Sequence, residues 1–280
     1  MASTRIAVIG DIHHGQDTPT KKGSVALSLL DRFIDEISSG RFDTVVELGD
    51  RISDESPDRD RVLQKEVADR FNQLSIPHHH LSGNHDVALL SLADNEAILG
   101  RPSGSRSVVI GGVRCVFWQP DVSLTPERGL HLAPGDHDAL VRLLAEDDRP
   151  TLLVSHVPLS GQSQRGNYYF ERNPGHASYA EVDTIRTAIA EAPCPIVALA
   201  GHVHWNTLTT VDGTPHLTLQ SLTETFISGK PAEAIGALEI RGEVLNWTVT
   251  GREPLSVVLP WPKTKARWRA PLSRLTSSAA

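Results

Sequence analysis

Five short polar clusters follow apolar runs in this sequence, each at a position where a strand is expected to end. They are Asp11-Ile12-His13, Gly49-Asp50, Gly83-Asn84-His85-Asp86, Ser155-His156 and Gly201-His202-Val203-His204. Because ligands gather at the carboxyl ends of strands in α/β sheets, we expect these side chains to converge. Two carboxylates, one amide and four imidazoles form a donor set for two adjacent divalent metal ions, which is chemistry suited to moving phosphoryl groups.

The elements that must position these clusters alternate over the first part of the chain. Apolar runs predict strands at residues 6–9, 44–48 and 78–81, and helical spacing predicts helices near 25–37, 62–74 and 87–99. This alternation predicts a sheet with parallel neighbours and crossover helices. A hairpin is expected over 107–118, helices over 134–144 and 181–190, and strands at 151–155 and 196–200. From residue 207 onward the chain is expected to be mostly β, with strands at 208–211, 216–219, 234–240 and 244–249.

The sequence shows no second core and no internal repeat, so a single domain is predicted over residues 1–260. A basic tail with prolines and serines follows at 261–280. A long loop is predicted over 160–178, and loops of that length are commonly functional or disordered. Cys115 and Cys194 show no metal-ligand spacing, and both are expected to be reduced and structural.

Composition excludes several classes of protein. The 280 residues are 39% hydrophobic and 22% charged, as in globular domains, and the formal net charge is −7. This acidity disfavours a protein that tracks nucleic-acid backbone. No run approaches the length of a membrane span, and a strand begins almost at once at the N-terminus. A cytoplasmic protein is therefore expected, with no nucleic-acid or membrane partner.

The order of the motifs resembles that of a known family. Asp-x-His, Gly-Asp, Gly-Asn-His-Asp, a lone His and Gly-His-x-His, in this sequence, resemble the calcineurin-like metallophosphoesterases. The resemblance covers roughly residues 5–250. It implies an α/β fold built as a four-layer αββα sandwich, with two mixed β-sheets flanked by helices. It also implies an enzyme, a metal-dependent phosphoric ester hydrolase.

The resemblance further implies how the ligands are shared between two divalent or mixed-valence metal ions. One ion would take Asp11, His13 and His204, and the other would take Asn84, His156 and His202. Asp50 would bridge both ions together with a hydroxide, which would attack phosphorus in line. Carboxylate and imidazole suit Mn, Fe, Zn, Co or Ni, and the lack of thiolates disfavours a closed structural zinc site.

His85 is implied to be catalytic rather than a ligand, because in the family pattern it faces the leaving group and can protonate the departing oxygen. Asp86 is predicted as the partner that orients or charges it. The sequence departs from the family in two places. Many members carry an acidic residue three positions after the bridging aspartate, where this chain has Ser53, with Asp54 one position further on. Arg51 follows the bridge in place of an apolar residue.

Substrate contacts are predicted for Arg51, Asn167, Tyr168 and Arg172. The alternative for the three loop residues is a surface excursion packed by its own aromatic side chains. For Arg51 the alternative is an ion pair with Asp54. The run His78-His79-His80 is expected to be structural or to lie on the surface, with adventitious metal binding as the alternative.

The function predicted from these features is hydrolysis of a small phosphodiester, because no cap domain is evident and an open site tolerates a second substituent on phosphorus. A phosphomonoesterase with the same mechanism is the alternative. A nuclease is less favoured because no basic stripe with interleaved aromatics precedes the tail. A catalytically silent scaffold is disfavoured by the complete ligand set. Composition leaves the oligomeric state open and admits a homo-oligomer.

Overall fold

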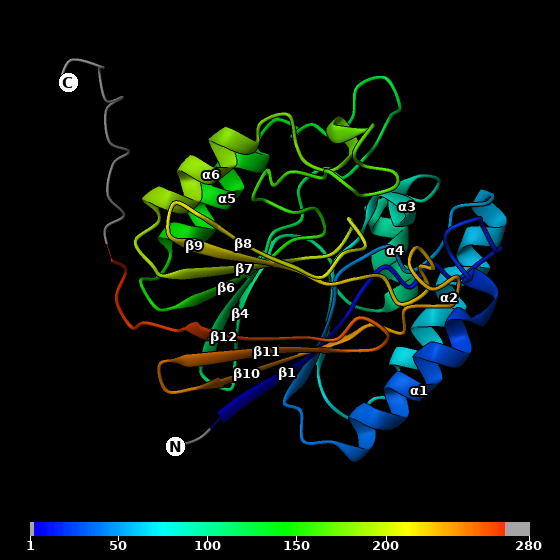
Figure 1. Cartoon of the computed structure of the whole chain (residues 1–280), viewed down its shortest axis with the longest axis horizontal. Coiled ribbons are helices and arrows are strands. Elements are labelled where there is room, and N and C mark those ends of the chain that lie inside the picture. Colours follow the sequence, from blue (N-terminus) through cyan, green and yellow to red (C-terminus); the bar gives the residue numbers. More distant parts are fainter. Residues whose placement is uncertain (1–2, 267–280) are drawn as a thin grey trace, which may run out of the picture.

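Two six-stranded β-sheets packed face to face form the centre of the molecule in the computed structural model, which describes residues 3–266 (Figure 1). The first sheet contains, in spatial order, β12 (Leu255–Pro260), β11 (Val244–Thr250), β10 (Ile235–Arg241), β1 (Ser3–Ile9), β2 (Thr44–Glu47) and β3 (His78–His80). The second contains β4 (Arg106–Ile110), β5 (Val113–Phe117), β6 (Thr151–Val154), β7 (Ile196–Ala200), β9 (Thr214–Thr218) and β8 (Thr207–Val211).

Both sheets are mixed. The strands β1, β2 and β3 are parallel neighbours, and so are β5, β6, β7 and β9. Antiparallel pairs complete each sheet, for example β1 with β10 and β8 with β9. The predicted crossover pattern therefore holds for the strands that carry the polar clusters, because parallel strands bring their carboxyl ends to one edge.

Helices cover the outer face of each sheet, so the molecule has four layers in the order α, β, β, α (Figure 1). On the first sheet lie α1 (Ala26–Ser39), α2 (Pro57–Phe71) and, beyond the short α3 (Asn84–Val87), α4 (Leu92–Leu99), which packs beside α2. On the second sheet lie α5 (Asp136–Ala145) and α6 (Val182–Glu191). The predicted fold class is confirmed.

Each interface between layers has its own apolar interior. Phe117 and Trp247 are buried between the two sheets, Phe33 and Phe71 between the first sheet and its helices, and Leu140 between the second sheet and α5. Each of these side chains is fully buried, and burial of a large side chain contributes about 1.5–3 kcal/mol to folding. These interiors make the sheets a rigid support for the loops at the strand ends.

The structure corrects two of the predicted elements. The helix predicted over 87–99 begins later, because the short α3 ends at Val87 and a capping box of Ser91 and Asp94 starts α4 at Leu92. The strand β12 was not predicted. It lies at the sheet edge, and burial along it alternates between half-buried and exposed positions except near its end, which leaves little apolar signal.

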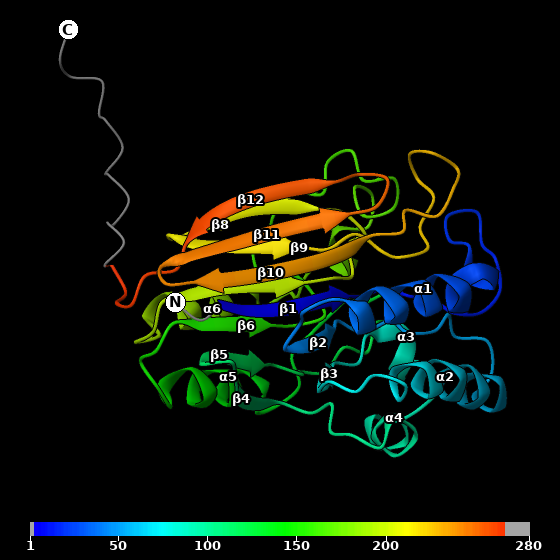
Figure 2. The same ribbon diagram turned by 90° about the horizontal axis from the view of Figure 1, so that it is seen from below.

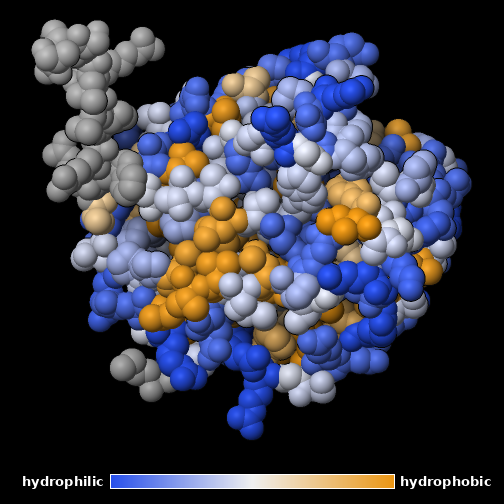
Figure 3. Space-filling model, in the orientation of Figure 1, coloured by the Kyte–Doolittle hydropathy of each residue, from blue (hydrophilic) through white to orange (hydrophobic). Residues whose placement is uncertain are grey.

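The two strands β12 and β8 end their sheets on the same side of the sandwich (Figure 2). An apolar patch lies over this region of the surface, where Val258 of β12 and Leu208 of β8 are exposed (Figure 3). The chain remains packed just past β12, since Trp261 is buried in the core between the sheets. The division into a domain over 1–260 and a tail stays a prediction, and most of the tail, 267–280, lies outside the described residues.

Two further observations concern the predictions from composition. Cys115 and Cys194 are both buried and unpaired, as a structural role for reduced cysteines requires. Within residues 3–266, none of the helices combines the length and the apolar character that crossing a bilayer would need.

Candidate metal centre

The backbone at the strand ends adopts an unusual conformation at the predicted ligands. Within residues 3–266, seven non-glycine residues have positive φ, and five of them are predicted ligands: Asp11, His13, Asp50, His202 and His204. A left-handed conformation costs such residues free energy and persists only where the surroundings enforce it, and it concentrates at functional sites. The chain therefore bends sharply after β1, β2 and β7 in order to turn these side chains toward one another.

Hydrogen bonds between the loops hold these bends in place. The amide of Asp11 donates to Gly49 O at 2.9 Å, and the amide of His13 donates to Asp50 O at 3.0 Å. The amide of His202 donates to both carboxylate oxygens of Asp11, each at 3.0 Å. The loops after β1, β2 and β7 thus form one hydrogen-bonded unit.

Two glycines make the close approach of these loops possible. A Cβ atom on Gly83 would lie 2.2 Å from Asp50 Oδ1, and one on Gly201 would lie 2.4 Å from Asp11 Oδ2. Carbon atoms do not approach oxygen this closely, so any larger residue at either position would push a predicted ligand out of place.

One group of donors gathers around Asp11, His13 and His204. The Nε2 atoms of His13 and His204 are 2.9 Å apart, and His204 Nε2 is 3.3 Å from Asp11 Oδ1. Asp50 Oδ2 lies 3.8 Å from His13 Nε2, which connects this group to the bridging carboxylate. The carboxylates of Asp11 and Asp50 and the ring of His13 are almost completely buried.

A second group gathers around Asp50, His156 and His202. His156 Nε2 lies 3.4 Å from Asp50 Oδ2 and 3.3 Å from Asn84 Oδ1. The other ring nitrogen of His156 donates to Leu48 O at 2.9 Å, and His202 Nε2 donates to the His176 carbonyl at 2.7 Å. In the neutral rings such bonds select the tautomer in which His156 Nε2 and His202 Nδ1 carry the lone pairs.

The protonation of these groups is strongly perturbed. Burial acts to raise the pKa of Asp50, but the facing imidazoles, His156 foremost, outweigh it and hold this pKa well below its usual range. Burial likewise opposes the charging of His156, yet Asp50 and Asp11 raise its pKa to about 9. Burial and the neighbouring His156 lower the pKa of His202 to about 4.

The donor set fits two cations on its chemistry. Carboxylate oxygens, an amide oxygen and imidazole nitrogens converge in a buried place, and in the metal-free chain protons on the imidazoles occupy the positions that cations would take. The structure thus brings together all seven predicted ligands, and Asp50 stands between the two groups, where a bridging carboxylate would be.

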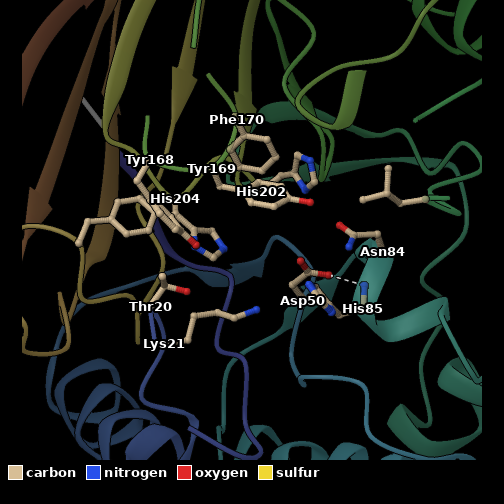
Figure 4. Close-up of a pocket in the computed structure, with 12 residues that line it drawn as sticks. Thr20, Lys21, Asp50, Asn84, His85, Tyr168, Tyr169, Phe170, His202 and His204 are labelled. Atoms are coloured by element: carbon tan, nitrogen blue, oxygen red, sulfur yellow. Dashed lines mark hydrogen bonds between the residues drawn. The ribbon is translucent and has the colours of Figure 1, made fainter. Parts of the chain in front are cut away.

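His85 lies at the exposed side of this cluster, where its amide donates to Asp50 Oδ1 at 2.9 Å (Figure 4). Its Nδ1 is hydrogen-bonded to the carboxylate of Asp54 rather than to Asp86, which corrects the predicted partner. That hydrogen bond is the main cause of a lowered pKa at Asp54. A signal for this pair was present in the sequence, because the acidic residue expected three positions after Asp50 stands one position later, at Asp54. The loop still brings the Asp54 carboxylate to His85.

Asp86 points into the interior instead. Its carboxylate accepts hydrogen bonds from the amides of Asp50 at 2.8 Å, Arg51 at 3.0 Å and Gly83 at 2.9 Å. Because these amides belong to the loops after β2 and β3, Asp86 ties together the two loops that present Asp50 and Asn84. The predicted catalytic position is therefore a positioning one.

Arg51 is also fully buried, which corrects its prediction as a substrate contact or as an ion-pair partner of Asp54. Its guanidinium donates to Glu47 Oε2 at 2.7 Å and to Gln64 Oε1 at 2.8 Å, and it lies 3.3 Å from Asp86 Oδ2. We call Glu47, Arg51, Gln64, His80, Asp86 and Asn95 the Arg51 network. His80 joins it through Glu47, and His78 bonds to His80 at 2.7 Å, which agrees with the structural interpretation of that histidine run.

A pocket of about 260 Å³ opens onto the cluster (Figure 4). Tyr168 lines it, and its contact with a substrate stays a prediction. Asn167 does not line it but is buried behind it, where its Nδ2 donates to Val203 O at 3.1 Å. Arg172 is exposed on the surface and also does not line it. The pocket is lined further by residues that sequence reasoning missed: Thr20, Lys21, Leu124, Tyr169, Phe170 and Phe226. No motif marks most of them; only the aromatic content of the 160–178 loop was a signal.

Comparison with known proteins gives a family match that spans most of the chain. Residues 4–206 match the family described as calcineurin-like phosphoesterase, and this range contains all five polar clusters. No curated protein matches the chain in sequence.

Solved structures share the fold at low sequence identity. A dimetal phosphatase from Danio rerio is 14% identical, covers 92% of this chain and 99% of its own, and superposes with a TM-score of 0.74. PhoD is 10% identical over 93% of this chain and 69% of its own, with a TM-score of 0.58. The Plasmodium protein GAP50, described as the anchor in the inner membrane complex, is 14% identical over 95% and 91%, with a TM-score of 0.55. A phosphatase and an anchor protein thus share this fold, so the fold alone does not decide the function.

Proposed function

Because the chain belongs to the calcineurin-like phosphoesterase family and is a metal-dependent phosphoric ester hydrolase, we propose that it hydrolyses a small phosphodiester at the pocket over Asp50. The observation that carries this proposal is the meeting of all seven predicted ligands beneath an open pocket that also contains His85. Hydrolysis of a phosphodiester with an alkyl leaving group uses both features, since phosphorus must be polarised and the departing alkoxide must receive a proton.

We assign the ligands in two groups. Asp11, His13 and His204 would hold one divalent cation, Asn84, His156 and His202 would hold the other, and Asp50 would contact both. When bound, such a pair activates a water molecule as the nucleophile and offsets the negative charge of the phosphoryl oxygens.

The remaining groups act on the leaving side. Asp54 holds Nδ1 of His85, which leaves Nε2 as the nitrogen available to the pocket. In the protonated ring, Nε2 donates its proton to the departing oxygen as the bond between phosphorus and that oxygen breaks. Water supplies the oxygen of the new bond to phosphorus, and one of its protons restores His85. The products are a phosphomonoester and an alcohol, so atoms and charge balance.

The Arg51 network supports this site from behind. Asp86 fixes the two loops that carry Asp50 and Asn84, and the guanidinium of Arg51 in turn pairs with the carboxylates of both Asp86 and Glu47. The ligands are therefore positioned before any cation binds, which lowers the cost of ordering them on binding.

The proposal is tested by reconstituting the metal-free protein with Mn²⁺ and comparing bis-p-nitrophenyl phosphate with p-nitrophenyl phosphate. We expect turnover of the diester that EDTA stops and Mn²⁺ restores. Turnover of the monoester alone would replace the proposal with a phosphomonoesterase of the same mechanism. Absence of turnover with either ester, in protein shown by elemental analysis to contain two metal ions per chain, would overturn it.

A further inference from the structure

The pocket has an aromatic wall that the metal chemistry does not require. The rings of Tyr168 and Phe226 have their centroids 4.2 Å apart, and Phe226 lies nearly parallel to the ring of His204 at 6.2 Å. Tyr168 is 54% exposed, although a tyrosine ring buries a large apolar area when it is placed in a core. Aromatic side chains left exposed beside a polar cluster commonly contact a ligand.

Backbone hydrogen bonds build this wall from distant segments of the chain. The amide of Thr225 donates to Thr20 O at 2.8 Å, and the amide of Lys22 donates to Thr223 O at 2.9 Å. The carboxylate of Glu224 accepts the amide of Phe226 at 2.8 Å and so fixes the turn that presents this ring. The segment that presents Phe226 is therefore held in place by these hydrogen bonds.

The aromatic wall and His85 lie on different sides of the metal centre. Figure 4 shows Tyr168 and His204 on one side of Asp50, and Asn84 and His85 on the other. Because His85 marks the side of the leaving group, the aromatic wall faces the group that stays on phosphorus. A monoester has no such group, whereas a diester has one.

Side chains that can donate hydrogen bonds line the pocket next to the aromatic wall. Thr20 and Lys21 line the pocket on the side of His204, and the ammonium group of Lys21 has one hydrogen-bond partner within the described residues, His13 Nδ1 at 3.3 Å. If His13 uses Nε2 to hold a cation, its Nδ1 carries a proton and can no longer accept from Lys21. The ammonium group is then available to an oxygen of the substrate.

We propose that Tyr168 and Phe226 form a subsite for a planar ring on the retained substituent of the phosphodiester, with Lys21 contacting an oxygen at the phosphoryl end of that substituent. This inference rests on the proposed phosphodiesterase function and names its substrate class. The ring is either a simple aryl group or a nucleobase, since both stack on aromatic side chains.

Three diesters with one leaving group test the subsite: methyl, phenyl and thymidine 5′ p-nitrophenyl phosphate. All release p-nitrophenolate, so only the retained substituent differs. We expect kcat/KM for the better of the two ring-bearing diesters to exceed that of the methyl diester by roughly tenfold, which corresponds to about 1.4 kcal/mol. A preference for phenyl identifies a simple aryl substituent, and a preference for thymidine identifies a nucleoside.

Substitutions of Tyr168 and Phe226 test whether the aromatic wall causes the preference for ring-bearing diesters. In Tyr168→Ala and Phe226→Ala, the ratio of kcat/KM for the ring-bearing diester to kcat/KM for the methyl diester should fall toward one. Ile227→Ala is the matched control, because Ile227 is an apolar neighbour that is 68% exposed and does not line the pocket. Lys21→Met should raise KM for all three diesters more than it lowers kcat.

The outcomes separate this inference from the function on which it rests. Turnover of all three diesters at equal kcat/KM would overturn the subsite and leave the phosphodiesterase intact. A ring preference that survives both alanine substitutions would also overturn it. Absence of metal-dependent turnover with every diester would instead overturn the proposed function.

Discussion

Two buried polar clusters lie next to each other in this molecule, and they differ in the group that carries their positive charge. In the Arg51 network, one guanidinium faces the carboxylates of Glu47 and Asp86, and amide groups complete the hydrogen bonds. In the ligand cluster, the carboxylates of Asp11 and Asp50 face imidazoles and an amide oxygen, with no arginine among them. Asp86 connects the two clusters, since it accepts the amide of Asp50.

The difference shows how to distinguish a structural polar cluster from a cation site. Buried charges are tolerated when opposite charges and hydrogen bonds satisfy them, as Arg51 does for its network. In the ligand cluster a titratable imidazole carries the positive charge, since Asp50 and Asp11 raise the pKa of His156 to about 9, and a bound cation can replace that proton. The same types of residue thus form a permanent ion pair in one cluster and a set of candidate cation ligands in the other.

The substitution Asp50→Asn should break the ligand cluster and have the largest effect. Loss of the bridging charge should remove metal-dependent turnover and reduce the metal content measured by elemental analysis. In the native protein, Mn²⁺ at about a hundred times its dissociation constant should stabilise the fold by about 2.7 kcal/mol, and this gain should vanish in the variant. Asp35→Asn on the exposed face of α1 is the control. Full activity in Asp50→Asn would refute the bridging role.

The substitution His85→Asn tests the pair of His85 and Asp54, which borders the ligand cluster. We expect kcat to fall by about 10²–10⁴-fold for a diester with an alkyl leaving group, because the departing alkoxide needs a proton. The loss should be smaller for p-nitrophenolate, which leaves without one. Asp54→Asn should show the same dependence on the leaving group, to a lesser degree. Equal losses for both leaving groups, or a loss of metal, would contradict the assignment.

The substitution Arg51→Met should break the network instead of the metal centre. It leaves Glu47 and Asp86 buried without their counter-charge, and breaking a buried pair in this way costs about 3–5 kcal/mol of the free energy of unfolding. Urea unfolding of the metal-free protein measures it. Arg59→Met, at an exposed position on α2, should change stability by less than about 0.5 kcal/mol. Unchanged stability with a raised KM would restore the substrate contact predicted from sequence.

The smallest expected effect is that of His79 on how the free energy of unfolding depends on pH. Burial, with Arg106 and Arg101, lowers the pKa of His79 from 6.5 to about 4. On acidification the unfolded chain takes up this proton first, so the contribution to stability is full above pH 6.5 and is lost as the pH falls toward 4. His79→Phe should therefore reduce the slope of unfolding free energy against pH by less than about 1.4 kcal/mol per pH unit, since solvent screens the ring in part.

The slope is measured by urea unfolding between pH 4.5 and 7. An identical slope in His79→Phe and the native protein would show that this histidine charges equally in both states.

Much of the metal centre was predictable because each of its parts is local in the sequence. A ligand motif such as Asp11-x-His13 directly follows the strand that presents it, and a parallel sheet brings the ends of such strands together whatever lies between them. The layered fold was predictable for the same reason, since the periodicity of each element is a local property.

The direction of individual side chains was not predictable in this way. Asp86 follows His85 in the chain, but α3 turns its carboxylate inward to the amides of the loops, while Asp54 comes across from another loop to His85. Arg51 follows the bridging aspartate, yet it extends into the interior because Glu47 and Asp86 are there to receive it. Position in the chain does not determine which face of a loop is buried.

By itself, the sequence determined the fold class, the family and the set of candidate ligands, since short motifs and hydrophobic periodicity carry this information. Only the tertiary structure decided which polar cluster is closed by Arg51, which carboxylate holds His85, and that Tyr168 and Phe226 share one wall. The physical reason is that these outcomes depend on burial and on hydrogen bonds between segments far apart in the chain. Such contacts form only when the packed layers bring the segments together.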